Sequence, residues 1–200
     1  MKPQQIIIIH GGTTFKDYQD YVGYLATKQL EISRFLYQPK WKESLQQKLG
    51  DDYQVLLPTM PNATNARYSE WKVWFDNLSA IITDDCILIG HSLGGIFLAK
   101  YLSEKTFPRR IKATILVAAP HSDETTEDLT DFKLKTTSAG LAKQAGRLVF
   151  IFGNDDPVVP LSEMEKYKAD VPLAEFRIVS APDHFVRPEF SELIELIDSL

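Results

Sequence analysis

Cysteine is nearly absent from this sequence of 200 residues, which holds a single one, Cys86. One cysteine cannot form a disulfide within the chain, and Cys86 opens an apolar segment typical of a buried strand. We therefore expect Cys86 to be a small core residue, and we expect the protein to reside in the reducing environment of the cytoplasm. The four histidines are scattered, without cysteines or carboxylates at ligand spacing, so we expect neither a metal site nor another cofactor.

Long apolar runs and an excess of positive charge are also missing. No apolar stretch approaches the roughly 20 residues that cross a bilayer, so we expect no membrane association. A formal net charge of −5 argues against nucleic acid or an anionic membrane surface as the main partner. The length and an ordinary apolar fraction of 44% suit a single domain over residues 1–200 with a sizeable core.

The most informative stretch is 86–101, with the sequence CILIGHSLGGIFLAKY. Its first residues predict a strand, its glycines a sharp turn, and the apolar residues after Gly95 a helix. Ser92 lies at the tip between Gly90 and Gly94, which is the G-x-S-x-G pattern of a nucleophile elbow in its expected context. Side chains at the two flanking glycines would collide in so tight a turn. The alternative is an ordinary glycine turn between a strand and a helix.

Segments typical of strands alternate with segments typical of helices along the whole chain. The predicted strands cover 5–10, 53–57, 86–89, 113–118, 147–152 and 175–179. The predicted helices cover 41–50, 65–82, 96–107, 161–168 and 188–199, with further helical turns within 16–37 and 134–145. This alternation predicts an α/β fold with a mostly parallel sheet of about six strands and helices on both faces. In such sheets the loops at the carboxyl ends of the strands form the site.

Two other features have a structural interpretation. Trp71 and Trp74 fall in the amphipathic helix predicted for 65–82, and we interpret both as core residues in preference to a ligand-binding aromatic box. The polar segment 122–140 is typical of a lid or an irregular connection. Its acidic residues are expected to form a solvated surface: Asp123, Glu124, Glu127 and Asp128.

A serine hydroxyl is a weak nucleophile, so it needs a base, an acid to orient the base, and donors for the oxyanion. His91 adjoins Ser92 on the elbow, where its side chain points away from the serine's. His10 and His121 follow earlier strands and are predicted to bind substrate. His184 follows the last strand and completes the order serine, acid, histidine, so we predict it as the base. The alternative for His184 is an ordinary polar loop residue.

Two adjacent aspartates follow the fifth predicted strand, where the acid is expected. Asp156 precedes Pro157, which stiffens the loop, and Asp155 is its rival. Either could instead cap a helix or form a turn.

The oxyanion donors are predicted to be backbone N–H groups. Leu93 begins the helix after the elbow, where N–H groups are unpaired. The second donor should come from the loop after the first strand, from Gly12 or alternatively Thr13. The neighbouring His10 and Gly11, together with Thr13, are predicted to bind substrate.

Taken together, these motifs resemble a known family. The chain is similar to small single-domain α/β-hydrolases, and most of all to the compact bacterial serine hydrolases related to the retinoblastoma-binding protein 9 family. The likeness extends over nearly the whole chain, through HGGTT, PTMPN, the tryptophan-rich helix, IGHSLGG, FGNDDPVVP and PDHF. It implies Ser92 as nucleophile, Asp156 as acid and His184 as base.

The chain departs from that family in two places. The segment 15–37 is longer than the corresponding loop, and no large cap domain follows the fourth strand. The lack of a cap implies an open site suited to modest or bulky acyl groups.

These observations predict a cofactor-independent serine hydrolase that cleaves an ester or related acyl bond through an acyl-enzyme intermediate. Its partner would be a small acyl substrate. One alternative is a protein-binding member of the same fold, because fold does not fix function and the resembled family has been linked to protein partners. Another is an acyltransferase that uses the same three residues.

Overall fold

The computed structural model describes residues 2–122, 125, 128–134 and 139–200. Within these residues, six strands form one sheet in the order β2-β1-β3-β4-β5-β6, and every neighbouring pair is parallel. The strands are β1 (Gln4–Ile9), β2 (Tyr53–Leu56), β3 (Cys86–His91), β4 (Ile111–Val117), β5 (Arg147–Gly153) and β6 (Glu175–Val179). The predicted parallel sheet is confirmed.

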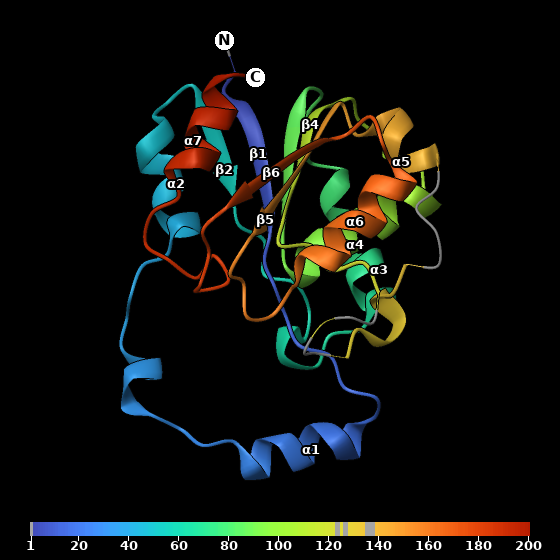
Figure 1. Cartoon of the computed structure of the whole chain (residues 1–200). Coiled ribbons are helices and arrows are strands. Elements are labelled where there is room, and N and C mark those ends of the chain that lie inside the picture. Colours follow the sequence, from blue (N-terminus) through green and yellow to red (C-terminus); the bar gives the residue numbers. More distant parts are fainter. Residues whose placement is uncertain (1, 123–124, 126–127, 135–138) are drawn as a thin grey trace.

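Helices cover both faces of this sheet, as Figure 1 shows. One face carries α2 (Trp41–Leu49) and α7 (Ser191–Asp198). The other carries α3 (Tyr68–Ser79), α4 (Leu93–Glu104), α5 (Ala139–Gln144) and α6 (Leu161–Asp170). Short 3-10 helices are η1 (Ile32–Phe35), η2 (Ala63–Asn65) and η3 (Thr130–Phe132). Across the described residues, no helix combines the length and the apolar character that a membrane crossing requires.

The side chains of β1 alternate between two hydrophobic cores. Ile6 and Ile8 pack in the core beneath α2 and α7, whereas Ile7 and Ile9 pack in the core beneath α3 and α4. All four isoleucines are buried. A strand covered on both faces needs apolar residues at every position, which explains the continuous isoleucine run.

The prediction that both tryptophans of α3 lie in the core is wrong for one of them. Trp71 is fully buried, but Trp74 is 46% exposed. The buried residues of α3 form one stripe, Tyr68, Trp71, Phe75 and Ser79. Trp74 is three residues from Trp71 and lies at the edge of this stripe, where its side chain is partly exposed.

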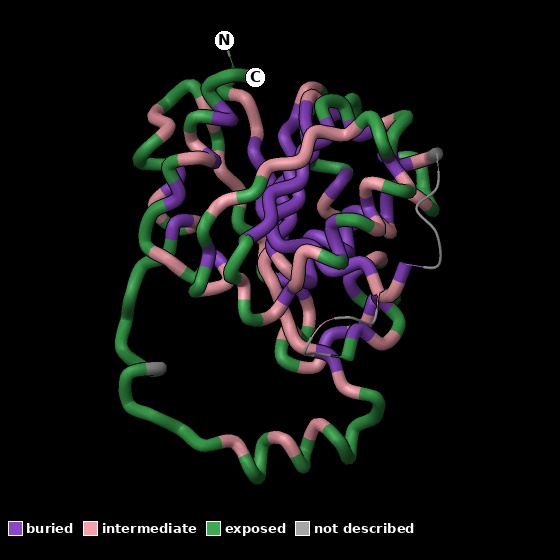
Figure 2. The backbone as a smooth tube through the Cα atoms, viewed as in Figure 1, coloured by how far each residue is buried: buried purple, intermediate pink, exposed green. Residues whose placement is uncertain are grey.

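The segment between β1 and α2 forms an arm, residues 15–40, that extends away from the rest of the molecule (Figure 1). The helix predicted in this region is confirmed as α1 (Tyr18–Thr27), yet it has no buried residue, and Figure 2 shows the arm without buried segments. Its large exposed apolar side chains are Tyr18, Val22, Leu25, Leu30, Ile32, Phe35, Leu36 and Tyr37. The arm therefore contributes little to the hydrophobic cores.

The polar segment 122–140 is described only in part. It contains η3 and the start of α5, and Leu129 and Phe132 within it are buried. Of the acidic residues expected to form a solvated surface, Asp128 is exposed, whereas Asp123, Glu124 and Glu127 lie outside the described residues.

Candidate active site

Ser92 lies in the turn between β3 and α4. Its backbone has φ 55° and ψ −120°, a region that residues with side chains rarely occupy. The Ser92 N–H donates to the carbonyl of Val117 at 2.8 Å, and the Gly95 N–H donates to the carbonyl of Ser92 at 2.8 Å. The predicted strand, sharp turn and helix around the serine are thus present, and neighbouring backbone holds the turn in place.

Close packing at this turn requires its glycines. A Cβ atom on Gly90 would lie 2.5 Å from the carbonyl oxygen of Gly94, and one on Gly94 would overlap the carbonyl oxygen of Ile9. The start of α4 therefore approaches the carboxyl end of β1 closely. A Cβ atom on Gly11 would lie 3.2 Å from Cβ of Ser92, so the loop after β1 lies directly against the serine.

Two loops bring Asp156 and His184 together. Nδ1 of His184 lies 2.9 Å from Oδ1 and 2.8 Å from Oδ2 of Asp156. Oδ1 also accepts the N–H groups of Val158 and Val159, at 2.8 and 3.1 Å. The Asp156 side chain is fully buried. A carboxylate only accepts, so Nδ1 carries the proton and Nε2 is left to accept one from a hydroxyl.

Asp155 has a different role from its neighbour. Its carboxylate accepts the Ser180 hydroxyl at 2.9 Å and the Ala181 N–H at 2.5 Å. The Ala181 hydrogen bond is the main reason that the pKa of Asp155 lies below its usual value. Asp155 therefore braces the start of the loop that carries His184, while Asp156 contacts the imidazole itself.

The elbow and the His184 loop are in direct contact. Ser92 follows His91 in the chain, and the rings of His91 and His184 are 5.2 Å apart between centroids. Nε2 of His91 lies 2.9 Å from the carbonyl oxygen of His184. Among the described residues the Ser92 hydroxyl has no hydrogen bond; in ligand-free sites such bonds are often long and shorten when substrate binds.

Two backbone N–H groups of the predicted oxyanion site have no acceptor among the described residues, those of Gly12 and Leu93. Leu93 is the first residue of α4, where helical N–H groups are unpaired. By contrast, the Thr13 N–H donates to the carbonyl of Ala63 at 2.8 Å. Of the two residues predicted for the second donor, Gly12 is the one whose N–H is available.

His10, which was predicted to bind substrate, holds two loops together. Its Nδ1 lies 2.6 Å from the carbonyl of Gly11, and its Nε2 accepts the Met60 N–H at 2.9 Å. Its ring packs edge-on against Trp71 at 5.7 Å, and burial lowers the pKa of His10. With both ring nitrogens engaged, His10 has no free group to offer a substrate.

His121 is likewise engaged within the fold. Its Nε2 lies 2.8 Å from Oδ2 of Asp170, its ring packs against Tyr167 at 4.9 Å, and its N–H donates to buried Glu163. Among the residues that the structure describes, no contact of His121 supports the predicted role in substrate binding. Within the described ranges, no group of three or more His, Cys, Asp or Glu side chains could hold a metal ion.

A small hollow lies beside Ser92. Its lining comes from the elbow and from loops after β4 and β5: Ser92, Leu93, Pro120, Thr125, Leu129, Val158 and Val159. Its volume of about 10 Å³ has room for roughly one water molecule. The open site that the missing cap implied stays a prediction. The sequence analysis did not predict Leu129, Val158 and Val159 as residues of the site. The one signal for them is that they come after predicted strands, where the loops of the site are expected.

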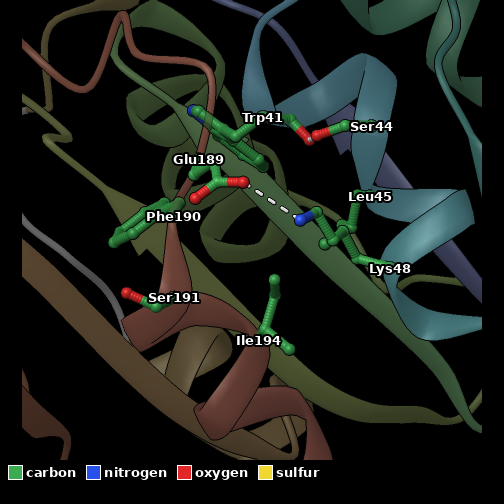
Figure 3. Close-up of a pocket in the computed structure, with 8 residues that line it drawn as sticks. All are labelled: Trp41, Ser44, Leu45, Lys48, Glu189, Phe190, Ser191 and Ile194. Atoms are coloured by element: carbon green, nitrogen blue, oxygen red, sulfur yellow. Dashed lines mark hydrogen bonds and ion pairs between the residues drawn. The ribbon is translucent and has the colours of Figure 1, made fainter.

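A larger groove of about 130 Å³ lies between α2 and α7 (Figure 3). Its apolar lining includes Trp41, Leu45, Phe190 and Ile194, and an ion pair of 3.0 Å between Lys48 and Glu189 joins its two sides. Ser92, Asp156 and His184 do not line this groove. We therefore relate the chemistry to the small hollow at the elbow.

Comparisons with known proteins give the family and the fold of the chain. Residues 37–191 match a family model described as serine hydrolase. No curated protein shows significant sequence similarity to the chain. The ydeN gene product of Bacillus subtilis has a similar structure, with 20% identity, a TM-score of 0.77, and coverage of 98% of this chain and 97% of that one.

Two further solved structures are similar over almost the whole chain. A YdeN-like hydrolase from Pectobacterium atrosepticum has 14% identity, a TM-score of 0.59, and coverage of 98% and 90% of the two chains. A structure from a study of carboxylesterases of Nitrososphaera gargenis has 17% identity, a TM-score of 0.58, and coverage of 99% and 89%. At such identities the likeness shows the fold alone, and it confirms the predicted α/β-hydrolase fold.

Proposed function

Because the chain belongs to the serine hydrolase family and is a hydrolase of the α/β type, we propose that it cleaves an ester or related acyl bond. Ser92 is the nucleophile, His184 the base and Asp156 the acid that orients the base. The narrower resemblance to the retinoblastoma-binding protein 9 family stays a prediction, as does the cytoplasmic setting.

The proposed reaction gives each of these groups one role. Ser92 Oγ attacks the carbonyl carbon while Nε2 of His184 takes the hydroxyl proton, and the buried Asp156 carboxylate stabilises the resulting imidazolium. The N–H groups of Gly12 and Leu93 donate to the oxyanion; losing one such donor raises the barrier by about 3 kcal/mol. His184 then protonates the leaving group, and water activated by the same imidazole releases the acyl group from Ser92.

The observation that carries the proposal is the contact of the buried Asp156 carboxylate with Nδ1 of His184, through both oxygens. This contact leaves Nε2 as the basic nitrogen on a loop that touches the elbow. The carboxylesterase neighbour supports an ester as substrate.

A series of p-nitrophenyl esters from acetate to palmitate tests this function. We expect the wild type to turn over at least one of these esters, and the chain length with the highest kcat/KM gives the size of the acyl pocket. Ser92→Ala should lower kcat by about a thousandfold or more, whereas Ser69→Ala, at an exposed serine on α3, should leave kcat unchanged.

A folded wild type without ester turnover, or a Ser92→Ala variant with the wild-type rate, would contradict the proposal. An added alcohol separates hydrolysis from acyl transfer, since transfer produces a new ester. A protein-binding member of the fold would turn over none of these esters.

A further inference from the structure

The loop that carries His184 has an uncommon backbone. His184 has φ 52° and Phe185 has φ 55°, two consecutive left-handed residues that are not glycine. Such conformations persist when the surrounding structure holds them in place. The position of the imidazole therefore depends on the groups that bind the backbone of this loop.

The first turn of α2 supplies several of these groups. The indole Nε1 of Trp41 donates to the carbonyl of Phe185 at 3.0 Å, and the Trp41 N–H donates to the carbonyl of Arg187 at 2.9 Å. Trp41 is almost fully buried and packs against Phe190 at 5.6 Å. One helical turn thus binds the loop at two points beyond the imidazole.

A third connection reaches His184 itself through two side chains. Nζ of Lys42 lies 2.8 Å from Nδ1 of His91, and Nε2 of His91 lies 2.9 Å from the carbonyl oxygen of His184. An ammonium group only donates and a carbonyl only accepts, so His91 must be neutral with its proton on Nε2. In agreement, burial, followed by the charge of Lys42, holds the pKa of His91 well below its usual value.

The position of Lys42 has no explanation in an ion pair. Among the described residues, no carboxylate lies within salt-bridge distance of its ammonium group, unlike that of Lys48 on the same helix. Burial lowers the pKa of Lys42 to about 8, which is a cost to the fold at neutral pH. Its hydrogen-bond partner is His91, the last residue of β3 and the neighbour of Ser92 in the chain.

We propose that Lys42 is a positioning residue for the base. By donating to Nδ1 of His91, it keeps the His91 proton on Nε2, and this N–H holds the carbonyl of His184. Without Lys42, the proton of His91 can move to Nδ1. Two acceptors, Nε2 of His91 and the carbonyl oxygen, would then face each other and push the His184 loop away from the elbow. This role rests on the proposed function, because it concerns the base of the same site.

Kinetics of p-nitrophenyl acetate hydrolysis test the role. In Lys42→Met and His91→Leu we expect kcat to fall about tenfold, with KM within about twofold, because a displaced base slows the chemical step without touching substrate. His91→Gln should recover most of the rate, since its amide can accept from Lys42 and donate to His184. Lys48→Met, whose side chain is exposed and paired with Glu189 (Figure 3), should behave as wild type.

Nitrogen NMR of the wild type gives a second readout that needs no variant to fold. We expect His91 to be neutral with its proton on Nε2. A proton on Nδ1, or Lys42→Met with the wild-type kcat, overturns the role of Lys42. If the wild type hydrolyses the ester and Lys42→Met and His91→Leu have the same kcat as the wild type, this inference alone fails. If the folded wild type turns over no ester, the proposed function fails and the inference fails with it.

Discussion

At the scale of single residues, the elbow is limited by the space around its glycines. The carbonyl of Ile9 occupies the position that a side chain on Gly94 would need. Since Ile9 is the last residue of β1, its carbonyl cannot move without disturbing the end of that strand. Glycine at 94 is thus a packing requirement of the contact between β1 and α4.

Gly94→Ala should lower the free energy of unfolding by roughly 2–3 kcal/mol, the upper part of the range for overpacked sites. Gly23→Ala is the matched control, because a Cβ atom on Gly23 in α1 would meet nothing within 4 Å. Urea unfolding of both variants measures the difference. Equal stabilities for the two alanine variants would show that the elbow has more room than the structure gives it.

The lowered pKa of His91 predicts an acid-sensitive fold. In the folded state His91 stays neutral below its ordinary value of 6.5, because of burial and the nearby charge of Lys42, whereas in the unfolded chain it gains a proton. The unfolded state then binds more protons. The stabilisation is complete above pH 6.5 and is lost as the pH falls, by about 1.4 kcal/mol per pH unit while the folded His91 remains neutral.

Urea unfolding of the wild type and of His91→Gln between pH 7.5 and 5 checks this. We expect the wild type to lose stability faster than the glutamine variant below pH 6.5. Parallel stability curves for the two proteins would mean that His91 titrates equally in the folded and unfolded states.

At the scale of elements, the arm is unusual because it forms a helix without a buried face. An isolated helix of this length is marginal in water. The side chain of Asp17 accepts the N–H groups of Gln19 and Asp20, and Phe15 packs against Tyr21 and Tyr24 at 5.3 and 5.0 Å. These local contacts support α1, together with a contact of 3.3 Å between the hydroxyls of Tyr21 and Thr64 on η2.

Replacing residues 18–36 by a Gly/Ser linker of equal length should leave the melting temperature of the protein within about 2 °C, because no residue of α1 is buried. Trp41→Ala, just beyond the arm, should instead lower the free energy of unfolding by about 3–5 kcal/mol. Calorimetry of both variants measures these changes in stability. A large drop in melting temperature on replacing the arm would show that the arm packs against the body.

The elements also show where sequence patterns succeed and fail. Hydrophobic spacing correctly predicted α1 and the strands, because periodicity reports the local conformation directly. It failed for Trp74, which lies beside the buried stripe of α3, since spacing alone does not fix the edge of a buried face. Hydrophobic spacing also did not predict that the arm extends away from the cores. The apolar residues of the arm have the spacing of a packed helix, but they face solvent.

At the scale of the whole molecule, the parallel sheet brings distant parts of the chain together. The carboxyl ends of β3, β5 and β6 meet at one edge, so loops separated by about ninety residues of sequence come into contact, as His91 and His184 do. This part of the candidate site was predictable, because alternating strands and helices predict a parallel sheet, and the loops that follow parallel strands lie at the same edge of the sheet.

Two features of the site were not predictable in this way. Asp155 and Asp156 are adjacent and chemically identical, and only the turn geometry directs one to Ala181 and the other to His184. Lys42 was missed because it lies on a helix far along the chain from Ser92, with no motif around it. Contacts of this kind depend on packing between elements, which spacing along the sequence does not encode.

The adjacent aspartates give a matched pair of variants. Asp156→Asn should lower kcat by about a thousandfold or more, because the amide favours the wrong tautomer of His184. Asp155→Asn should cost less than about tenfold, since its carboxylate braces the loop through Ser180 and Ala181 without touching the imidazole. Ester hydrolysis by the two variants checks this order, and the reverse order would assign the acid to Asp155.

The central claim is that Ser92 is an activated nucleophile, and a fluorophosphonate probe tests it most directly. Intact mass spectrometry of the folded wild type should show one adduct, and peptide mapping should locate it on Ser92. His184→Ala should react far more slowly, and Ser92→Ala should gain no adduct. A folded wild type that remains unlabelled, or an adduct on another residue, would contradict the account.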